Sequence, residues 1–354
     1  MMTTLKRGAG IAVALLALGA LVGCSSPASA PTPTTTKESQ VPVVHVTVAE
    51  QGLGGFSGGF LPHLADKLGY FASEGIVVDN YVSVANGQAA INGMVSGSIT
   101  FAHSAPEGIV ADQSGAGIIG IACGWASPAF FMVAKPGLTS WSDLKGKTIA
   151  IGAPNDITAV IVKDLIKKAG LDPNRDVKYV ALGATPARVS ALLNGQVDAT
   201  VATLQGISVP LSQKKLVNLG AAPKGTEQIP VLSSDIEVSK NWANSHRSAT
   251  VAYLRAIHKA LIYAKDPAHQ DYVINLIDAV SGLPDGSNTP SLKYYLISPP
   301  KGSFYFPLNM HVPAGIFAST IKAYKQIGFL APSVKMSESA YMDYTFADAA
   351  LRSK

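Results

Sequence analysis

Cysteine is scarce in this chain of 354 residues, and its histidines are thinly spread. The two cysteines are Cys24 and Cys123, and the seven histidines form no H-x-x-x-H pattern. Zinc sites need ligands at such short spacings, or a C-x-x-C pair, and neither occurs. The sequence therefore predicts no metal site, and we expect no cofactor. Cys123 ends the apolar run 117–123, which predicts a buried, inert thiol.

Charged residues are also few, at 14% of the chain, whereas hydrophobic residues make up 47%. This composition is typical of an ordered globular protein with a large core, and the length allows one to three domains. The net charge is only +5, and the basic residues are scattered. The densest basic pairs, Lys167-Lys168 and Lys214-Lys215, are interpreted as solvated faces. We therefore expect no nucleic-acid partner.

The apolar run 9–22 is too short for a comfortable membrane span. It follows Lys6-Arg7 and ends at Cys24, and residues 21–24 (LVGC) resemble the bacterial lipobox. We expect a signal peptide over 1–23, lipidation of Cys24, and a flexible tether over 24–42, which is rich in Ser, Thr and Pro. An ordinary signal peptide is the alternative. The prediction is an extracytoplasmic protein anchored to the cell membrane through Cys24.

A helix–glycine–strand pattern occurs twice, at residues 87–102 (GQAAINGMVSGSITFA) and 185–200 (TPARVSALLNGQVDAT). In each, Gly97 or Gly195 stands just after the helix, where a positive φ is needed. The glycines are 195 − 97 = 98 residues apart, which is the length of a small domain. Two similar α/β lobes around a ligand cleft would explain the repetition, although the pattern is common in α/β proteins generally.

Alternating strands and helices predict α/β units with mostly parallel sheets. From about residue 231 the chain turns mainly helical, and a proline-rich stretch precedes the last long helix. Strands are expected at 43–48, 76–78, 118–123, 130–133, 149–151, 177–181 and 216–219, and helices at 60–68, 87–95, 105–113, 157–169, 241–264, 271–280 and 313–327.

Four segments, in order, resemble the substrate-binding proteins of ABC importers for nitrate, sulfonates, taurine and thiamine precursors. They are residues 61–78 (LPHLADKLGYFASEGIVV), 87–102, 141–151 (WSDLKGKTIAI) and 191–199 (ALLNGQVDA). The resemblance covers roughly residues 43–235 and is weaker beyond them.

The resemblance implies the type II periplasmic-binding fold, with two α/β lobes joined by two crossovers and a ligand cleft between them. Lobe one would comprise residues 43–134 and 232–354, and lobe two residues 135–231. The crossovers are expected near 133–137 and 229–234. The implied function is the delivery of a small polar organic or oxyanion ligand to an ABC permease in the membrane. We expect a monomer without enzymatic activity.

Ligands of open parallel sheets bind beyond the carboxyl ends of the strands, where helix N-termini offer free N–H groups. The predicted strand ends supply mainly hydroxyls, amides and glycines, and Phe56 and Trp125 add rings that could stack on a ligand. The candidate ligand-binding residues are Phe56, Ser57, Asn86, Gly87, Gln88, His103, Ser104, Trp125, Asn155, Asp156, Thr158, Thr185, Arg188, Thr203, Gln205 and Ser233.

Each candidate has a structural alternative. Ser57 could only make a turn, Gln88 and Thr185 could be simple helix caps, and the rings of Phe56, Trp125 and Tyr305 could be core. His103 could be a hydrogen-bonded core histidine. Asp156 could be only a helix cap; facing the cleft, it would favour an N–H donor on the ligand. Arg188 could lie on the surface; facing inward, it would pair with a sulfonate or carboxylate. These opposing indications leave the ligand open.

Other functions have weaker support. Residues 55–59 (GFSGG) fit the G-x-S-x-G nucleophile elbow, but only one predicted strand precedes them. Gly52-Leu53-Gly54 begins like a dinucleotide fingerprint but has Ser57 at the third glycine position. The Cys-rich motif of the related thiamine-pyrimidine synthases does not occur. The remaining alternative is an extracellular ligand sensor, or partner-binding protein, of the same fold without transport.

Overall fold

The computed structural model describes residues 43–50, 59–84, 87–104, 107–127, 130–154, 156–301, 303, 305–326 and 328–352. The chain divides into two compact units, Met1–Gln40 and Val41–Lys354, and all described residues belong to the second. The expected signal peptide, Cys24 and the tether lie outside the described residues. Within the described part, no helix combines the length and apolar character needed to cross a bilayer.

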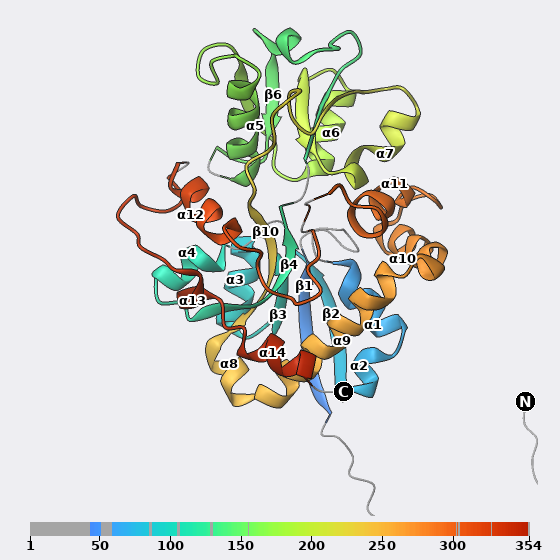
Figure 1. Ribbon diagram of the computed structural model, residues 1–354, viewed down its shortest axis with the longest axis vertical. Coiled ribbons are helices and arrows are strands. Elements are labelled where there is room, and N and C mark those ends of the chain that lie inside the picture. The colour runs from blue at the N-terminus through green and yellow to red at the C-terminus, as the bar shows by residue number, and fades with distance from the viewer. Residues whose placement is uncertain are drawn as a thin grey trace, which may run out of the picture. The chain divides into compact units, whose positions relative to one another are not determined.

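Two five-stranded sheets organise the unit Val41–Lys354 (Figure 1). Sheet A has the order β2-β1-β3-β10-β4 and sheet B the order β7-β6-β8-β5-β9. The strands of sheet A are β1 (Val44–Glu50), β2 (Ile76–Ser83), β3 (Phe101–Ser104), β4 (Ile118–Ala126) and β10 (Leu232–Ser239). Those of sheet B are β5 (Phe131–Ala134), β6 (Thr148–Ile151), β7 (Lys178–Ala181), β8 (Ala199–Ala202) and β9 (Val217–Gly220).

The two sheets share one topology. In each, the first three strands in spatial order are parallel, and the fourth, β10 or β5, is antiparallel to both of its neighbours. The repeated sequence pattern occupies equivalent places, because α3 (Gly87–Ser96) leads into β3 and α6 (Thr185–Leu193) leads into β8. Gly97 and Gly195 have φ of 79° and 71°, which confirms the conformation expected after each helix.

The first passage between the sheets comes earlier than the sequence suggested. The expected crossover at 133–137 overlaps β5, whose residues already pair with β8 and β9 of sheet B. This run is apolar and fully buried, so it belongs to a sheet interior rather than to an exposed connection. The chain therefore leaves sheet A after Ala126 and enters sheet B at Phe131. It returns between Gly220 and Leu232.

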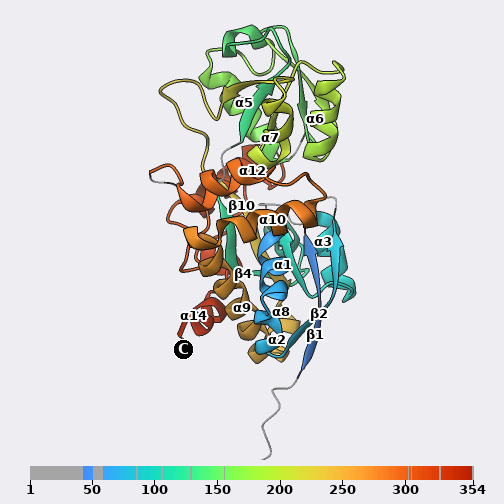
Figure 2. The ribbon, with the colours of Figure 1, turned by 90° about the vertical axis from the view of Figure 1, so that its right-hand side faces the viewer.

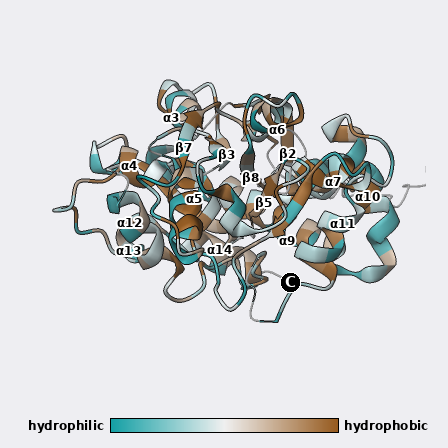
Figure 3. Cartoon of the chain, turned by 90° about the horizontal axis from the view of Figure 1, so that it is seen from above, coloured by the Kyte–Doolittle hydropathy of each residue, from teal (hydrophilic) through white to brown (hydrophobic). Residues whose placement is uncertain are grey.

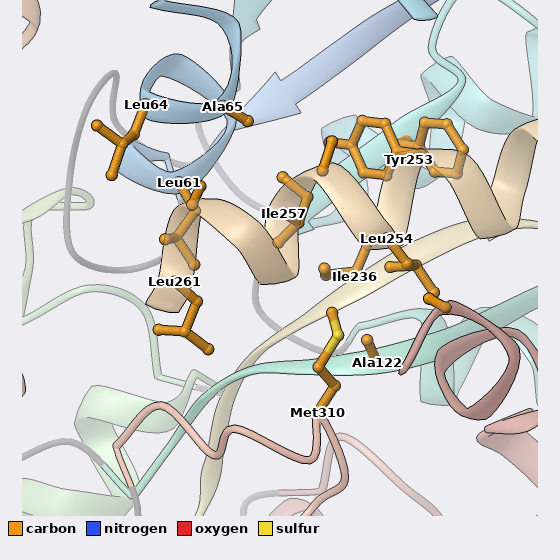
Figure 4. Packing of buried hydrophobic residues seen from close by; sticks show 14 of the residues in the cluster. Leu61, Leu64, Ala65, Ala122, Ile236, Tyr253, Leu254, Ile257, Leu261 and Met310 are labelled. Atoms are coloured by element: carbon orange, nitrogen blue, oxygen red, sulfur yellow. The ribbon is translucent and has the colours of Figure 1, made fainter. Parts of the chain in front are cut away.

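Helices cover both faces of sheet A. On one face, Leu61 and Leu64 of α1 (Phe60–Lys67) share a buried cluster with Ile257 and Leu261 of α9 (Arg247–Lys265) and with Ile236 of β10. Figure 4 shows the α9 side chains between α1 and the strands. On the other face, α3 and α4 (Gly108–Gln113) pack against β1, β3 and β4. Figure 2 shows α1 and α3 separated by the strands.

Sheet B is covered in the same way, by α5 (Ile157–Lys168) on one face and by α6 and α7 (Leu204–Ser212) on the other. The strands are largely hydrophobic, and the helices turn hydrophilic residues outward (Figure 3). The remaining helices are α2 (Tyr70–Ser73), α8 (Lys240–Ser245), α10 (Gln270–Ser281), α11 (Thr289–Leu292), α12 (Ile316–Gln326), α13 (Glu338–Tyr341) and α14 (Thr345–Arg352), with short turns η1 (Trp141–Leu144), η2 (Pro267–His269) and η3 (Lys293–Ile297).

The single helix expected over 241–264 is wrong, because the chain forms α8 and α9 with a break at His246. His246 has φ −122° and ψ 41°, outside the helical region. Its ring stacks on Trp242 at 4.5 Å, and its Nδ1 lies 3.1 Å from the Trp242 carbonyl. These local contacts compete with the helical conformation. The proline-rich stretch is also more regular than expected, since it contains α11 and the π-helical turn η3.

The positive φ at the end of α6 gives a test of the repeat. We expect Gly195→Ala to lower the free energy of unfolding by about 1–2 kcal/mol, because an L-residue is strained there. No heavy atom lies within 4 Å of the position of an added Cβ, so a steric clash does not contribute. Gly195→Asn is the matched control and should lose less, since Asn tolerates the left-handed region. Equal losses in urea unfolding would contradict this explanation.

Candidate ligand-binding site

Three helix N-termini meet at the carboxyl edge of the parallel strands in sheet B. Helix α5 follows β6, α6 follows β7 and α7 follows β8. The Gly183 N–H donates to the Gly152 carbonyl at 2.9 Å, which joins the loops before α6 and α5. A Cβ on Gly206 would lie only 2.7 Å from Cγ2 of Thr185, so the first turns of α7 and α6 are in contact.

These N-termini differ in how their N–H groups are satisfied. Asp156 caps α5, because its Oδ1 accepts hydrogen bonds from the Ala159 N–H at 3.0 Å and the Thr158 hydroxyl at 2.7 Å. The Thr158 hydroxyl in turn accepts from the Gly152 N–H at 2.8 Å. The N-cap residues of α6 and α7, Ala184 and Thr203, contribute no side-chain hydrogen bond. The Leu204 N–H at the start of α7 approaches the Tyr295 hydroxyl at 3.4 Å. The positive ends of the two helix dipoles favour an external acceptor, above all an anion.

Arg188 lies beside these N-termini and is only 3% exposed, which excludes the surface alternative. Its Nη2 donates to the Thr185 hydroxyl at 3.0 Å and to the Val201 carbonyl at 3.2 Å, and its Nε donates to the Thr200 hydroxyl at 3.3 Å. Nη1 donates to the Gly183 carbonyl. Thr185 and Arg188, two predicted site residues, are thus brought together.

The charge of this guanidinium has no direct counter-ion. No carboxylate in the described part of the chain forms an ion pair with Arg188, and all four acceptors are neutral. Burial lowers the pKa of Arg188, whereas the charge of Asp156 opposes that shift. A buried cation held only by dipoles is costly in free energy, so an anion bound next to it would be strongly favoured.

The lobe-one candidates on β3 are buried and already hydrogen-bonded. His103, 1% exposed, has its Nε2 2.7 Å from the Tyr253 hydroxyl. The Ser104 hydroxyl donates to Oε2 of Glu237 at 2.9 Å. Both residues end β3 at the carboxyl edge of sheet A. Their arrangement matches the core alternative for His103, and their contact with a ligand stays a prediction.

Trp125 belongs to an aromatic cluster at the end of β4. It stacks on Phe306, with centroids 5.8 Å apart and an interplanar angle of 8°, and it meets the edge of Tyr295 at 5.1 Å. Tyr305 packs against Tyr295 at 5.1 Å. The indole Nε1 of Trp125 is buried and lacks a hydrogen-bond partner among the described residues. This packing matches the core alternative stated for Trp125 and Tyr305, and contact of Trp125 with a ligand stays a prediction.

The other candidates are dispersed. Gly87 is buried at the start of α3, and exposed Gln88 donates to Asn92 at 3.1 Å. Gln205 of α7 donates to the Ser281 hydroxyl of α10 at 3.2 Å. Ser233 lies on β10, and its buried hydroxyl has no partner within the described part. Phe56, Ser57, Asn86 and Asn155 lie outside the described residues, as do residues 55–58 of the G-x-S-x-G pattern.

Comparison with known proteins decides the family. A sequence profile described as NMT1/THI5 like matches residues 62–270, more than half of the chain. The chain belongs to the NMT1/THI5-like family. The resemblance noted in the sequence is thereby confirmed at the level of the family. No curated protein sequence matches the chain at a significant level.

Solved structures confirm the predicted periplasmic-binding fold. The periplasmic nitrate-binding protein NrtA from Synechocystis superposes with a TM-score of 0.67 at 12% identity, covering 88% of this chain and 89% of that one. The periplasmic aliphatic sulphonate binding protein SsuA from Escherichia coli gives 0.62 at 17%, covering 80% and 87%. A ligand binding component of an ABC-type import system from Staphylococcus aureus, with zinc bound, gives 0.69 at 14%, covering 87% and 99%.

This NMT1/THI5-like protein also buries a carboxyl cluster that the sequence analysis missed. Asp235 and Glu237 are adjacent same-face positions of β10, and both are 0% exposed. The Tyr341 hydroxyl lies 2.9 Å from Oδ2 of Asp235 and 2.8 Å from Oε1 of Glu237. The alternation of acids with apolar residues in a strand could have indicated them. The described residues contain no group of three or more side chains that could hold a metal ion.

Counting protons shows that the pair is not fully ionised. A tyrosine hydroxyl has one proton, so it can donate to only one of the two carboxyl oxygens. A protonated carboxyl that donates to the Tyr341 oxygen accounts for the other short contact. In agreement, burial raises the pKa of Glu237 to about 7, and burial together with Glu237 raises the pKa of Asp235 well above its ordinary range. Burial and Glu237 also raise the pKa of Glu107 to about 8.

These raised pKa values predict that stability falls with rising pH. The folded protein binds more protons than the unfolded chain between the ordinary Glu pKa of 4.5 and the raised values of about 7 and 8. The free energy of unfolding therefore decreases across this interval, by on the order of 3 kcal/mol for Glu237 alone. Thermal unfolding from about pH 5 to 8.5 should show a falling midpoint.

The isosteric variant Glu237→Gln should flatten this dependence, because the amide mimics the protonated carboxyl. Glu227→Gln is the control, since Glu227 is exposed and its substitution should leave the slope unchanged. A midpoint that rises over this interval, or an unaltered slope in Glu237→Gln, would contradict the protonated cluster.

Proposed function

We propose that this protein is an extracytoplasmic solute-binding protein that delivers a small polar organic or oxyanion ligand to an ABC importer. The observation that carries the proposal is the buried guanidinium of Arg188, which lacks a carboxylate partner and lies beside the N-termini of α6 and α7, whose N-cap side chains form no hydrogen bond. Two relatives in fold are named for anions, nitrate and aliphatic sulphonates. A sulfonate, nitrate or carboxylate group would neutralise the positive charge of Arg188.

Asp156 is the acidic group whose charge acts on Arg188. Asp156 directs Oδ1 to the α5 N-terminus, where its charge is partly balanced by the helix dipole. A ligand with an N–H donor beside its anionic group would match both Arg188 and Asp156.

We expect binding to close the two lobes over the ligand. Lobe one would comprise residues 43–134 and 232–354, and lobe two residues 135–231, except that β5 belongs to sheet B and therefore to lobe two. Contacts already join α7 to the C-terminal part: the Leu204 N–H approaches the Tyr295 hydroxyl at 3.4 Å, and Gln205 donates to Ser281 at 3.2 Å. A ligand that binds the closed form more tightly shifts the population toward it, and a membrane permease would recognise that form.

The proposed location follows from the first residues of the sequence. The run ending in LVGC favours lipidation at Cys24, and the Ser-, Thr- and Pro-rich residues after it favour a flexible tether. A lipid-anchored binding protein stays close to its permease in the membrane. Metabolic labelling with a palmitate analogue tests this step, with Cys24→Ser as the unlabelled control.

A thermal-shift screen tests the ligand class. The panel contains taurine, alkyl- and arylsulfonates, nitrate, bicarbonate, short carboxylates, thiamine-pyrimidine precursors and riboflavin. A ligand at 100 times its Kd should stabilise the folded protein by about 2.7 kcal/mol, which is readily detected. We expect hits among the sulfonates or carboxylates. Hits restricted to uncharged rings would contradict an anion site, and an absence of hits would favour a sensor or partner-binding role.

Arg188 is tested with the ligand found in that screen. Arg188→Ala should weaken the binding of an anionic ligand by about 1.5–3 kcal/mol, the size of a charge-assisted hydrogen bond. Thr200→Val is the matched control, because it removes one hydrogen bond to the Arg188 Nε but keeps the charge. It should lower stability while leaving Kd nearly unchanged. An unaltered Kd in folded Arg188→Ala would remove Arg188 from the site.

A further inference from the structure

A cavity lies between α5, which packs on sheet B, and α12, which packs on sheet A. Its volume is about 380 Å³. Helix α5 lines it with Val160, Lys163, Asp164 and Lys167, at the spacing of one helix face. Helix α12 supplies the matching series Ser319, Lys322, Ala323 and Gln326. Figure 1 shows these two helices at the junction of the sheets, and nothing in the proposed function uses this cavity.

The charges of the lining are strongly unbalanced. Three lysines, Lys163, Lys167 and Lys322, face a single carboxylate, Asp164. That carboxylate is already paired with Lys168 at 2.6 Å. None of the three lysines forms an ion pair with any residue that the structure describes. Lys163 Nζ lies 5.8 Å from the centre of the Tyr179 ring. Lys167 and Lys322 come from opposite walls, so positive charge lines both sides of the cavity.

The floor of the cavity is apolar. Val160 of α5 and Ala323 of α12 form a buried cluster with Val231, and Ile229 packs against them. Pro173 and Ile229 complete the lining. The volume falls in the range of small-molecule sites, and such sites combine apolar walls with a few polar groups that fix orientation. The lysines around an apolar floor match a compact apolar body that carries charged groups at its rim.

We propose that this cavity binds a small organic polyanion, with two or three carboxylates on a compact apolar body. The apolar body would cover Val160, Ile229 and Ala323, and the carboxylates would reach Lys163 and Lys167 on one side and Lys322 on the other. The negative charges of the bound anion would attract the lysines of both helices and so hold the two walls together. Since the walls belong to different sheets, occupancy restrains the movement of one sheet relative to the other.

Isothermal titration calorimetry of the purified protein with trimesate, a benzene ring with three carboxylates, tests this site at pH 7 and constant low ionic strength. We expect saturable one-to-one binding, and weaker binding of the single-charge analogue benzoate. The double variant Lys167→Gln/Lys322→Gln should bind trimesate about tenfold more weakly, the size of two lost exposed ion pairs. Ser319→Trp, which fills the cavity and keeps all three lysines, should also weaken binding.

The matched control is Lys215→Gln/Lys335→Gln, which removes the same charge from two exposed lysines outside the cavity. It should bind trimesate like the wild type, as should Arg188→Ala, because Arg188 is not part of the lining. Circular dichroism confirms that each variant is folded. Absence of saturable binding, equal loss in both double variants, or loss in Arg188→Ala alone would overturn the proposal.

Discussion

The fold depends on one constraint, that each sheet receives its fourth strand from a segment that has just come from the other sheet. Strand β5 enters sheet B directly after β4 of sheet A, and β10 enters sheet A after β9 of sheet B. Each of these two strands is antiparallel to both of its neighbours in the sheet. The chain therefore passes twice between the two sheets, and each passage ends in a strand that lies inside the sheet it enters. Because β10 separates β3 from β4, sheet A cannot be completed until residues far along the chain have folded back, a long-range pairing that is expected to fold slowly.

The two sheets stabilise their buried ionisable side chains in opposite ways. Arg188 remains a cation, as any arginine does in a protein. The free-energy cost of burying its charge must therefore be offset by hydrogen-bond acceptors, and four neutral oxygens accept from it. Asp235 and Glu237 can instead become neutral, and their shared contact with Tyr341 favours a proton on the pair. Protonation thus removes the charge of the carboxyl cluster, although Oδ1 of Asp235 has no hydrogen-bond partner among the described residues. Arg188 retains an uncompensated charge, and this difference is why the anion site is placed at sheet B and not at sheet A.

Local sequence signals predicted most of the elements, because they report local physics. Gly97 and Gly195 end their helices with positive φ, and Asp156 caps α5, as their positions indicated. Long-range features were not predictable in this way. The periodicity of α6 does not tell which acceptors will surround Arg188, since these come from β8 and from the loop before the helix. The ring packing of Trp125 was not predictable either, because its neighbours Tyr295 and Phe306 lie far away in the sequence, in a stretch whose regular structure was not foreseen.

Helix α5 links the two proposed anion sites physically. Its first turn is capped by Asp156 at the edge that also holds Arg188, and later turns carry Lys163 and Lys167 into the cavity facing α12. The helix packs on sheet B through a continuous buried face, so it moves with that sheet as one body. A ligand at either site therefore acts on the position of α5 and sheet B relative to sheet A. If binding at one site changes the affinity of the other, the change must be equal in both directions, because the free energy of a cycle of binding steps does not depend on their order.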